Sequence, residues 1–344
     1  MEEEIQQRII EKCRNTRIMT PTKSLVEYYP QFSEMAIEAA ETFWPGNEYP
    51  VEDDLNDFLV NMTPAELHGV KTVLKLFTHY EIVVGCDYWS GYVMKNFPRP
   101  EVCRMASAFS HVENNSHAIF YDLINKVLGL STDEFYESYI KDTVLNARAK
   151  SLGDFLSHPI PLVAVGAFSM IEGAVLYSSF GYLKSYSTNG RNLIGNTTSG
   201  ISASVTDELA HSLGGAALYK TLLAEANLTN DELAYVQNEI IKMATIIKEH
   251  ETKIIEMIFS EYDDSNTNSK DVKDLITFVM SRINECLIKI DIPALYTNIK
   301  HNRIAEWFYN NVNTMQSNDF FSKLGKEYTR GWAKERFIWK VSAI

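Results

Sequence analysis

The 344-residue sequence has few of the residues that mark non-globular or disulfide-stabilised proteins. Its 10 proline and 16 glycine residues are too few for a collagen-like or low-complexity disordered chain. Its four cysteines, Cys13, Cys86, Cys103 and Cys286, form no CxxC pair and have no zinc-ligand spacing, a pattern typical of reduced thiols in the cytoplasm. Because 45% of the residues are hydrophobic and 12% are aromatic, we expect a globular protein with a packed core.

Signals for secretion, nucleic-acid binding and membrane insertion are also missing. The sequence begins with Met-Glu-Glu-Glu instead of the basic and apolar stretches of a signal peptide, so a cytoplasmic protein is expected. The formal charge of -13 comes from acidic residues spread along the chain, which argues against a nucleic-acid partner. The longest apolar stretch, residues 160–183, contains Glu172, whose charge would be costly in lipid. We therefore expect a buried helix here and no membrane contact.

Helix signals are frequent along the chain. Thr63, Pro64 and Glu66 combine an N-cap, a proline at the first helical position and a capping box, and they predict a helix that runs toward Lys95. A second helix is expected over residues 101–129. Further capping boxes lie at Ser131/Glu134 and Thr229/Glu232. More helices are expected at 161–185, 201–226, 231–260, 272–289 and 293–312.

These elements predict the fold class and the division of the chain. Strict alternation of polar and apolar residues, which would indicate strands, is absent, so the fold is predicted to be an all-α helical bundle with additional helices. Residues 1–60 are expected to form a largely irregular extension packed on the bundle, with one helix near 33–42. Residues 61–315 are expected to form the helical domain, and residues 316–344 a C-terminal tail.

The two halves of the helical domain repeat one order of acidic and imidazole side chains. In each half, a helix with one glutamate precedes a helix with a glutamate and a histidine: Glu81 before Glu113 and His117, then Glu172 before Glu208 and His211. Glu208 and His211 are three residues apart and share a helix face. Such a pair alone is more often part of a solvated surface. Here its neighbours are apolar, and an unpaired buried carboxylate would be strongly unfavourable.

Four carboxylates and two imidazoles on four helices form the ligand set of a dinuclear metal site. Carboxylate oxygens can bridge two metal ions, and imidazoles complete the coordination while leaving open positions for dioxygen. Scattered ion pairs within the core are the plainer explanation. We favour the metal site because the combination of six residues is much more specific than any one of them.

The same residues resemble the small subunits of class I ribonucleotide reductases, which have a ferritin-like fold. The resemblance covers residues 43–222 and rests on the order carboxylate, Glu/His helix, carboxylate and Asp-Glu-x-x-His, preceded by a Phe-Trp pair. It implies two metal ions, iron or a manganese–iron pair, that react with dioxygen to oxidise a nearby tyrosine. It also implies a homodimer and a separate large subunit in which ribonucleotides are reduced to deoxyribonucleotides.

The resemblance also implies roles for residues outside the ligand set. Trp44 would lie on the electron path to the large subunit, and Asp207 would link Trp44 to His117. Tyr121, four residues after His117, would hold the radical. Taken singly, these residues would be an aromatic anchor, a surface acid and a core side chain, but together they favour the functional roles. Tyr328 would be the redox-active tyrosine of the docking tail, although the tail here is basic instead of acidic.

One departure from the family pattern affects the radical position. Glu113 and His117 are four residues apart, whereas three is usual in the family. Both groups still share a helix face, and a one-residue π-bulge could absorb the extra residue. Counting seven from Glu113 gives Phe120, and a phenylalanine there would resemble manganese–iron variants that store the oxidant on the metals. We favour Tyr121, four residues after His117.

Two other functions are compatible with this type of fold and ligand set. The first is another diiron-carboxylate oxidase, such as a hydroxylase or desaturase, because fold and ligand set do not determine the reaction. Trp44, Asp207 and Tyr121 argue against it. The second is a non-enzymatic iron-binding bundle, which the length of the chain disfavours because ferritin-type chains are much shorter.

Overall fold

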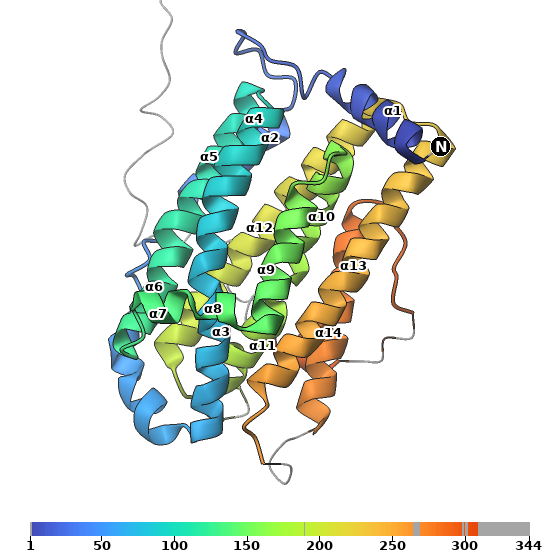
Figure 1. Cartoon of the computed structure of the whole chain (residues 1–344). Helices are drawn as coiled ribbons and strands as arrows, with labels where there is room; N and C mark the ends of the chain where they lie inside the picture. Colours follow the sequence, from blue (N-terminus) through green and yellow to red (C-terminus); the bar gives the residue numbers. More distant parts are fainter. Residues whose placement is uncertain (1, 189, 264–268, 298, 300–301, 309–344) are drawn as a thin grey trace, which may run out of the picture.

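The computed structural model describes residues 2–308, apart from residues 189, 264–268, 298, 300 and 301. All regular elements in this part of the chain are helices, and the long ones run side by side (Figure 1). The helices around the site are α3 (Pro64–Ile82), α5 (Pro100–Val112), α6 (Ala118–Val127), α10 (Pro161–Ala174) and α12 (Gly195–Ala226). The others are α1 (Glu2–Arg14), α2 (Pro30–Glu41), α4 (Met94–Asn96), α7 (Asp133–Tyr136), α8 (Ser138–Lys141), α9 (Thr143–Leu156), α11 (Tyr177–Lys184), α13 (Asn230–Ile258) and α14 (Ser269–Lys289).

Helix α10 lies at the centre of the fold. It packs along α12 and also contacts α9, α13 and α14, and every one of its residues is buried. A helix that is apolar on all sides is stable only where other elements surround it. Pro161–Ser187 is long and apolar enough to cross a membrane, but its most apolar 18-residue window is wholly buried inside the bundle. The expectation of a buried helix is confirmed.

The sequence predicted a single helix over residues 161–185, but the structure has two helices here. α10 ends at Ala174, and α11 begins at Tyr177 after Leu176, whose φ of 73° places it in the left-handed region. The break leaves backbone carbonyls without helical partners, and the Arg282 side chain donates from Nε to the Gly173 carbonyl at 2.8 Å. This contact comes from α14, more than 100 residues away, so no local signal predicted it.

Two of the three predicted capping boxes are present. The side-chain oxygens of Thr63 and Thr229 each accept a hydrogen bond from the backbone N–H three residues on, and the glutamate there bonds back. The third prediction was wrong by one residue, because Thr132 caps α7 while Ser131 donates to Asp122 at 2.9 Å. Ser131 Oγ also accepts a hydrogen bond from the Tyr136 hydroxyl at 3.3 Å, so its oxygen is directed to side chains and not to the start of the helix.

The first 60 residues contain more helix than predicted. α1 was missed, although its three acidic residues in the first turn and basic residues in the last turn suit the helix dipole. It buries Ile9, Ile10 and Cys13, and Lys12 binds Glu232 at 2.7 Å. α2 confirms the helix expected near 33–42. A 3-10 helix (η1, Val51–Asp54) and a π-helix (η2, Asp57–Asn61) follow.

The predicted helix over 293–312 begins later than expected. Residues 293–297 are not helical, whereas residues 303–308 are. Asn284 explains the difference, because its Oδ1 accepts hydrogen bonds from the backbone N–H groups of Leu295 and Tyr296, both at 2.9 Å. This loop conformation is stabilised by a side chain of α14. Residues beyond 308, with the tail and Tyr328, lie outside the described part of the chain.

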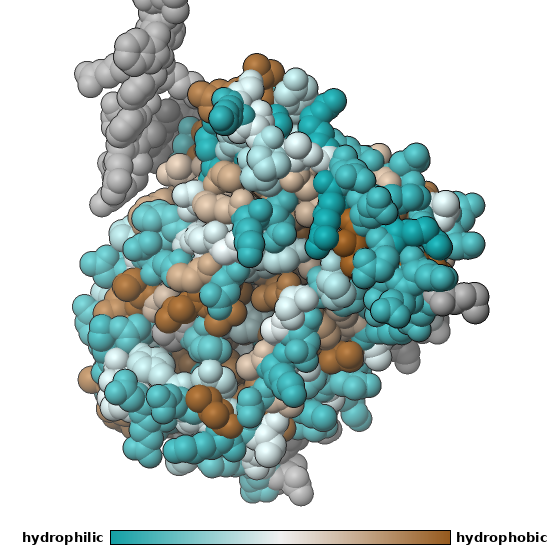
Figure 2. All heavy atoms as spheres, turned by 45° about the horizontal axis from the view of Figure 1, so that its top comes forward, coloured by the Kyte–Doolittle hydropathy of each residue, from teal (hydrophilic) through white to brown (hydrophobic). Residues whose placement is uncertain are grey.

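The surface agrees with the acidic, polar composition. On the face shown in Figure 2, hydrophilic residues cover most of the area and hydrophobic residues are scattered in small groups. Scattered exposed apolar residues are ordinary for a globular protein.

Candidate metal centre

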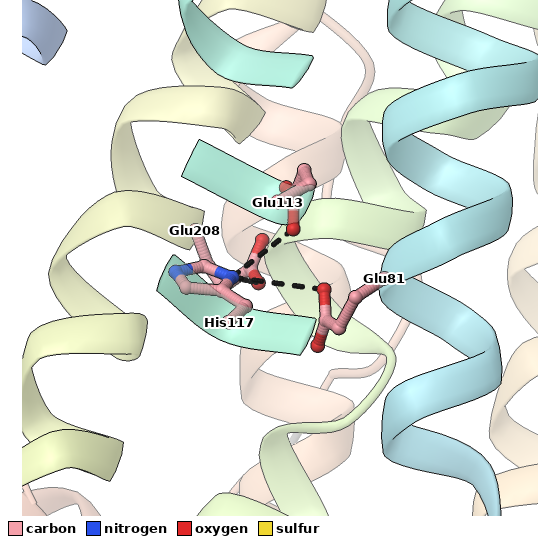
Figure 3. A group of neighbouring side chains, drawn as sticks. All are labelled: Glu81, Glu113, His117 and Glu208. Carbon is pink, nitrogen blue, oxygen red and sulfur yellow. Dashed lines mark hydrogen bonds and ion pairs between the residues drawn. The ribbon is translucent and has the colours of Figure 1, made fainter. Parts of the chain in front are cut away.

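Six side chains from four helical segments converge inside the bundle. Glu81 comes from α3, Glu172 from α10, and Glu208 and His211 from α12. Glu113 and His117 come from the π-helix Glu113–His117 (η4) between α5 and α6. All six side chains are buried, none more than 4% exposed. Figure 3 shows four of them pointing toward one another.

The six residues form two overlapping groups. Glu81, Glu113, His117 and Glu208 offer ligand atoms that all lie within 4.8 Å of one another, and so do Glu113, Glu172, Glu208 and His211. Glu113 and Glu208 therefore belong to both groups. Two ions side by side would each have one imidazole, one carboxylate of their own and two shared carboxylates. The cluster could hold two metal ions.

The distances show which oxygen of each shared carboxylate lies near which imidazole. Glu113 presents Oε2 to Nδ1 of His117 at 3.0 Å and Oε1 to Nδ1 of His211 at 2.6 Å. Glu208 presents Oε1 to the first imidazole at 3.4 Å and Oε2 to the second at 3.6 Å. Each carboxylate thus offers one oxygen on either side, as a bridging ligand does.

The end carboxylates are placed differently. Glu81 faces only His117, at 3.6 Å, and Glu172 faces only His211, at 3.9 Å. The arrangement therefore has an approximate two-fold pattern that follows the repeat in the sequence. It suits oxygen-preferring transition-metal ions that also accept imidazole.

The electrostatics of the cluster also call for cations. Burial, and then repulsion from neighbouring carboxylates, raises the pKa of Glu81 and Glu172 well above the ordinary value. At Glu113 the two imidazoles outweigh burial and hold the pKa below its usual range. The carboxylates in turn raise the pKa of His211 to about 9 despite its burial. Four carboxylates in one dry volume need protons or cations for compensation.

Several of the candidate ligand atoms do not make a full set of hydrogen bonds. Oε1 of Glu81 and Oε2 of Glu208 are enclosed and lack a hydrogen-bond partner in the described part of the chain, whereas Oε1 of Glu113 and Nδ1 of His211 have only each other, 2.6 Å apart. Buried polar atoms without partners are rare and unfavourable in native proteins. Their clustering at one point fits metal coordination, so the residues present fit a dinuclear centre.

The π-helix at Glu113–His117 accounts for the unusual spacing of this pair. A π-helix places residues four to five apart on one face, so Glu113 and His117 both point into the cluster. The bulge considered from the sequence is thus present. Another π-helix, Val83–Val93 (η3), follows α3 and was not predicted.

Trp44 and His117 meet at one oxygen of Asp207. The Trp44 indole donates from Nε1 to Oδ2 of Asp207 at 2.8 Å, and Nε2 of His117 lies 3.0 Å from the same oxygen. Trp44 and Asp207 are 163 residues apart in the sequence, and His117 and Asp207 are 90 residues apart. Since Nδ1 of His117 faces the cluster and Nε2 faces Asp207, a hydrogen-bonded connection leads from the cluster to Trp44.

Tyr121 lies in an aromatic environment beside the cluster. It is fully buried, and its ring centroid is 4.6 Å from that of Phe77 and 6.4 Å from that of His117. Phe180 packs behind Phe77 at 5.5 Å. The hydroxyl makes no hydrogen bond of good geometry among the described residues, and burial raises the pKa of the phenol well above its ordinary value, although nearby Ser204 acts in the opposite direction.

Phe120 faces a different set of neighbours. Its ring contacts Trp44 at 5.7 Å and Tyr49 at 6.0 Å, on the side of the Trp44–Asp207 connection. Phe120 and Tyr121 are therefore both near the cluster, but only Tyr121 packs on Phe77 of α3. Tyr328, the tail tyrosine, lies outside the described residues.

Trp89 is a residue of the site that the sequence analysis missed. It lies on η3, is fully buried, and donates from Nε1 to Oε1 of Glu172 at 2.9 Å. Its ring is also 6.0 Å from that of His211. Trp89 follows Glu81 by about two helical turns, and this spacing could have indicated that both lie on one helix face. The π-helical stretch between them changes which residues share that face, so the regular helical spacing did not reveal the contact.

Comparison with known proteins identifies the family. Residues 26–303 match the model of the family described as ribonucleotide reductase, small chain. The chain belongs to this family. A probable ribonucleoside-diphosphate reductase small subunit of Invertebrate iridescent virus 3 is 25% identical over 309 residues, covering 83% of this chain and 78% of the viral protein. The ribonucleoside-diphosphate reductase subunit beta of Halalkalibacterium halodurans is 25% identical over 323 residues, covering 90% and 88%.

Solved structures share the fold of this family member. The dimanganese(II)-NrdF of Streptococcus sanguinis superposes with a TM-score of 0.71 at 17% identity, covering 85% of this chain and 99% of that one. A putative class I ribonucleotide reductase from Bacillus halodurans gives 0.69 at 21% identity, covering 82% and 100%. The all-α, ferritin-like fold and the assignment as a ribonucleotide reductase small subunit are confirmed.

Proposed function

We propose that this small subunit generates a tyrosyl radical on Tyr121 and passes the oxidising equivalent through Trp44 to a separate large subunit. It would act in the cytoplasm as a homodimer, the state named for the related Rnr4 of Saccharomyces cerevisiae. The observation that carries the proposal is the connection from His117 through Asp207 to Trp44. A hydroxylase or desaturase uses its oxidant beside the metals and needs no such connection.

The six clustered side chains would hold the metals. Glu81 and His117 would serve one ion, Glu172 and His211 the other, and Glu113 and Glu208 would face both. The bound ions would supply, with dioxygen, the oxidising power for the reaction. We propose iron, with manganese in one or both positions as the alternative that the dimanganese neighbour supports.

Tyr121 would be the residue oxidised. Its pKa is raised, so it starts as a neutral phenol and must lose a proton together with an electron. Glu81 is the carboxyl that acts most strongly on the phenol, so the released proton would leave on the side of the ring that faces the cluster. Phe77 and Phe180 exclude water from the ring, which would lengthen the life of the radical.

Asp207 would accept the indole proton of Trp44 and return it. An oxidised indole becomes acidic at Nε1–H, and Oδ2 of Asp207 already accepts that hydrogen bond. The same oxygen contacts Nε2 of His117, so the carboxylate stays oriented in both states. Asp207 is therefore proposed as a positioning and proton-accepting residue.

The test separates storage of the oxidant from its use. Wild-type protein and Trp44→Phe are loaded with ferrous iron in air, examined by electron paramagnetic resonance, and then assayed with the large subunit. We expect both to show the stored oxidant and only the wild type to form deoxyribonucleotides. Normal reductase activity in Trp44→Phe would remove the transfer role of Trp44.

A further inference from the structure

Trp44 has an oxidisable neighbour that the proposed function does not use. The ring of Tyr49 meets that of Trp44 edge-on, with centroids 5.5 Å apart and planes at 69°. Its ring centroid is also 6.0 Å from that of Phe120. Of the described residues whose rings contact Trp44, which are Tyr49, His117 and Phe120, only Tyr49 has a readily oxidised side chain.

The segment that carries Trp44 and Tyr49 is attached to the metal-ligand helix. Gly46 donates its backbone N–H to the carbonyl of Asn115 at 3.1 Å, and Ser116 Oγ donates to the carbonyl of Trp44. A Cβ at Gly46 would lie 2.6 Å from both Ile119 and the Ser116 carbonyl, so only glycine permits this approach. The ring pair therefore has a defined position relative to η4.

Tyr49 reaches the surface, whereas Trp44 does not. Trp44 is only 6% exposed, and Nε1, the one polar atom of its side chain, donates a hydrogen bond to Asp207. Tyr49 is half-buried, and its hydroxyl is neither enclosed nor hydrogen-bonded to any described residue. A docked partner could thus approach the phenol of Tyr49 without moving Trp44.

We propose that Tyr49 relays the oxidising equivalent between Trp44 and the large subunit. This rests on the proposed function, which supplies the oxidised Trp44. Tyr49 gives one electron to the indole and its phenolic proton to surface water, while Trp44 recovers its Nε1 proton from Asp207. The neutral radical on Tyr49 then takes an electron and a proton from an oxidisable side chain of the large subunit. The reverse steps return the equivalent after turnover.

The surroundings of Tyr49 suit a proton-coupled step. Burial, with the charges of Glu48 and Asp207, raises the pKa of the phenol to about 12, so it is protonated at neutral pH. Electron loss must then be accompanied by proton loss at the hydroxyl, which the described residues do not enclose.

The experiment uses the full chain, loaded with metal, and its large subunit. Tyr49→Phe keeps the ring contact and removes the oxidisable phenol, and Tyr28→Phe serves as a control, since Tyr28 is 52% exposed and packs under Arg17 and Arg99. We expect Tyr49→Phe to store the oxidant as the wild type does but to form deoxyribonucleotides about 100-fold more slowly. Tyr28→Phe should match the wild type in both measurements.

A spectroscopic experiment tests the relay without relying on turnover. Tyr49 is replaced by 3-aminotyrosine, which is easier to oxidise, and the loaded protein is mixed with the large subunit and substrate. An aminotyrosyl signal should grow as the stored oxidant decays. Wild-type turnover in Tyr49→Phe, or no signal at position 49, would overturn the relay alone. A wild type that stores no oxidant would overturn the proposed function and the relay together.

Discussion

The indole of Trp89 donates a 2.9 Å hydrogen bond to Oε1 of Glu172, a carboxylate that faces the same cluster as His211. The same oxygen lies 3.9 Å from Nδ1 of His211, so the bond orients the carboxylate at this side of the cluster. No equivalent tryptophan contact is found at Glu81 within the described part of the chain. The two halves of the cluster, alike in their ligands, therefore differ in what surrounds them.

Trp89→Phe should weaken metal binding in one half of the cluster. The loss of a partner that orients a ligand lowers metal affinity by about 10- to 100-fold, and we expect this at the Glu172 and His211 position. The measurement is a metal titration monitored by calorimetry or by the electron paramagnetic resonance signal of Mn(II). Trp307→Phe, far from the cluster in sequence and only partly buried, is the control. Two unchanged affinities would show that the bond has no role in binding.

Glu208→Ala should prevent the binding of two metals. Glu208 lies in both groups of ligand atoms, so its removal takes one oxygen from each position. We expect fewer than two tightly bound ions per chain by elemental analysis after gel filtration. Glu239→Ala, which removes a carboxylate paired with Lys242 on α13, should bind the same amount as the wild type. Full loading of Glu208→Ala would count against the bridging role.

Tyr121→Phe should bind metals normally but give no tyrosyl signal after exposure to oxygen. Phenylalanine keeps the ring packing on Phe77, and the lost hydroxyl makes no hydrogen bond of good geometry in the described structure, so stability should change by less than about 1 kcal/mol. Tyr219→Phe, another buried tyrosine with an unpartnered hydroxyl, is the matched control. A tyrosyl signal that persists in Tyr121→Phe would place the radical elsewhere. A wild type with only a coupled metal signal would favour storage on the metals.

Lys184→Met should change how stability depends on pH. Burial lowers the pKa of Lys184 from 10.5 to about 8, and its Nζ bonds to Ser202 Oγ at 2.7 Å. The unfolded chain therefore binds more protons between pH 8 and 10.5, and the contribution of Lys184 to stability rises with pH over this range. Methionine carries no proton, so this contribution is absent from the variant.

The measurement for Lys184 compares urea unfolding of the two proteins. We expect the variant to be the more stable at pH 7 and its advantage to shrink up to pH 10.5, by roughly 3 kcal/mol at most. Lys242→Met, at an exposed lysine, should show no such trend. A difference that does not vary with pH would show that Lys184 is not destabilised by burial.

Much of the fold could be predicted from the sequence because helix signals are local. Thr63 with Glu66 and Thr229 with Glu232 act within one helical turn, and both begin helices as predicted. Predictions failed where a distant side chain decides the backbone. The break before Tyr177 is stabilised by Arg282, and the late start of the last helix depends on Asn284.

The candidate site was predictable in its composition more than in its arrangement. The sequence by itself determined which residue types were available and that each glutamate–histidine pair shares a helix face, because helical spacing sets that. Only the tertiary structure decided that Trp89 bonds to Glu172 and that Tyr49 packs on Trp44 at the surface. The first pair is 83 residues apart, and the second depends on a loop held against η4. Such contacts follow from how helices pack and where loops are attached, which spacing along one chain does not encode.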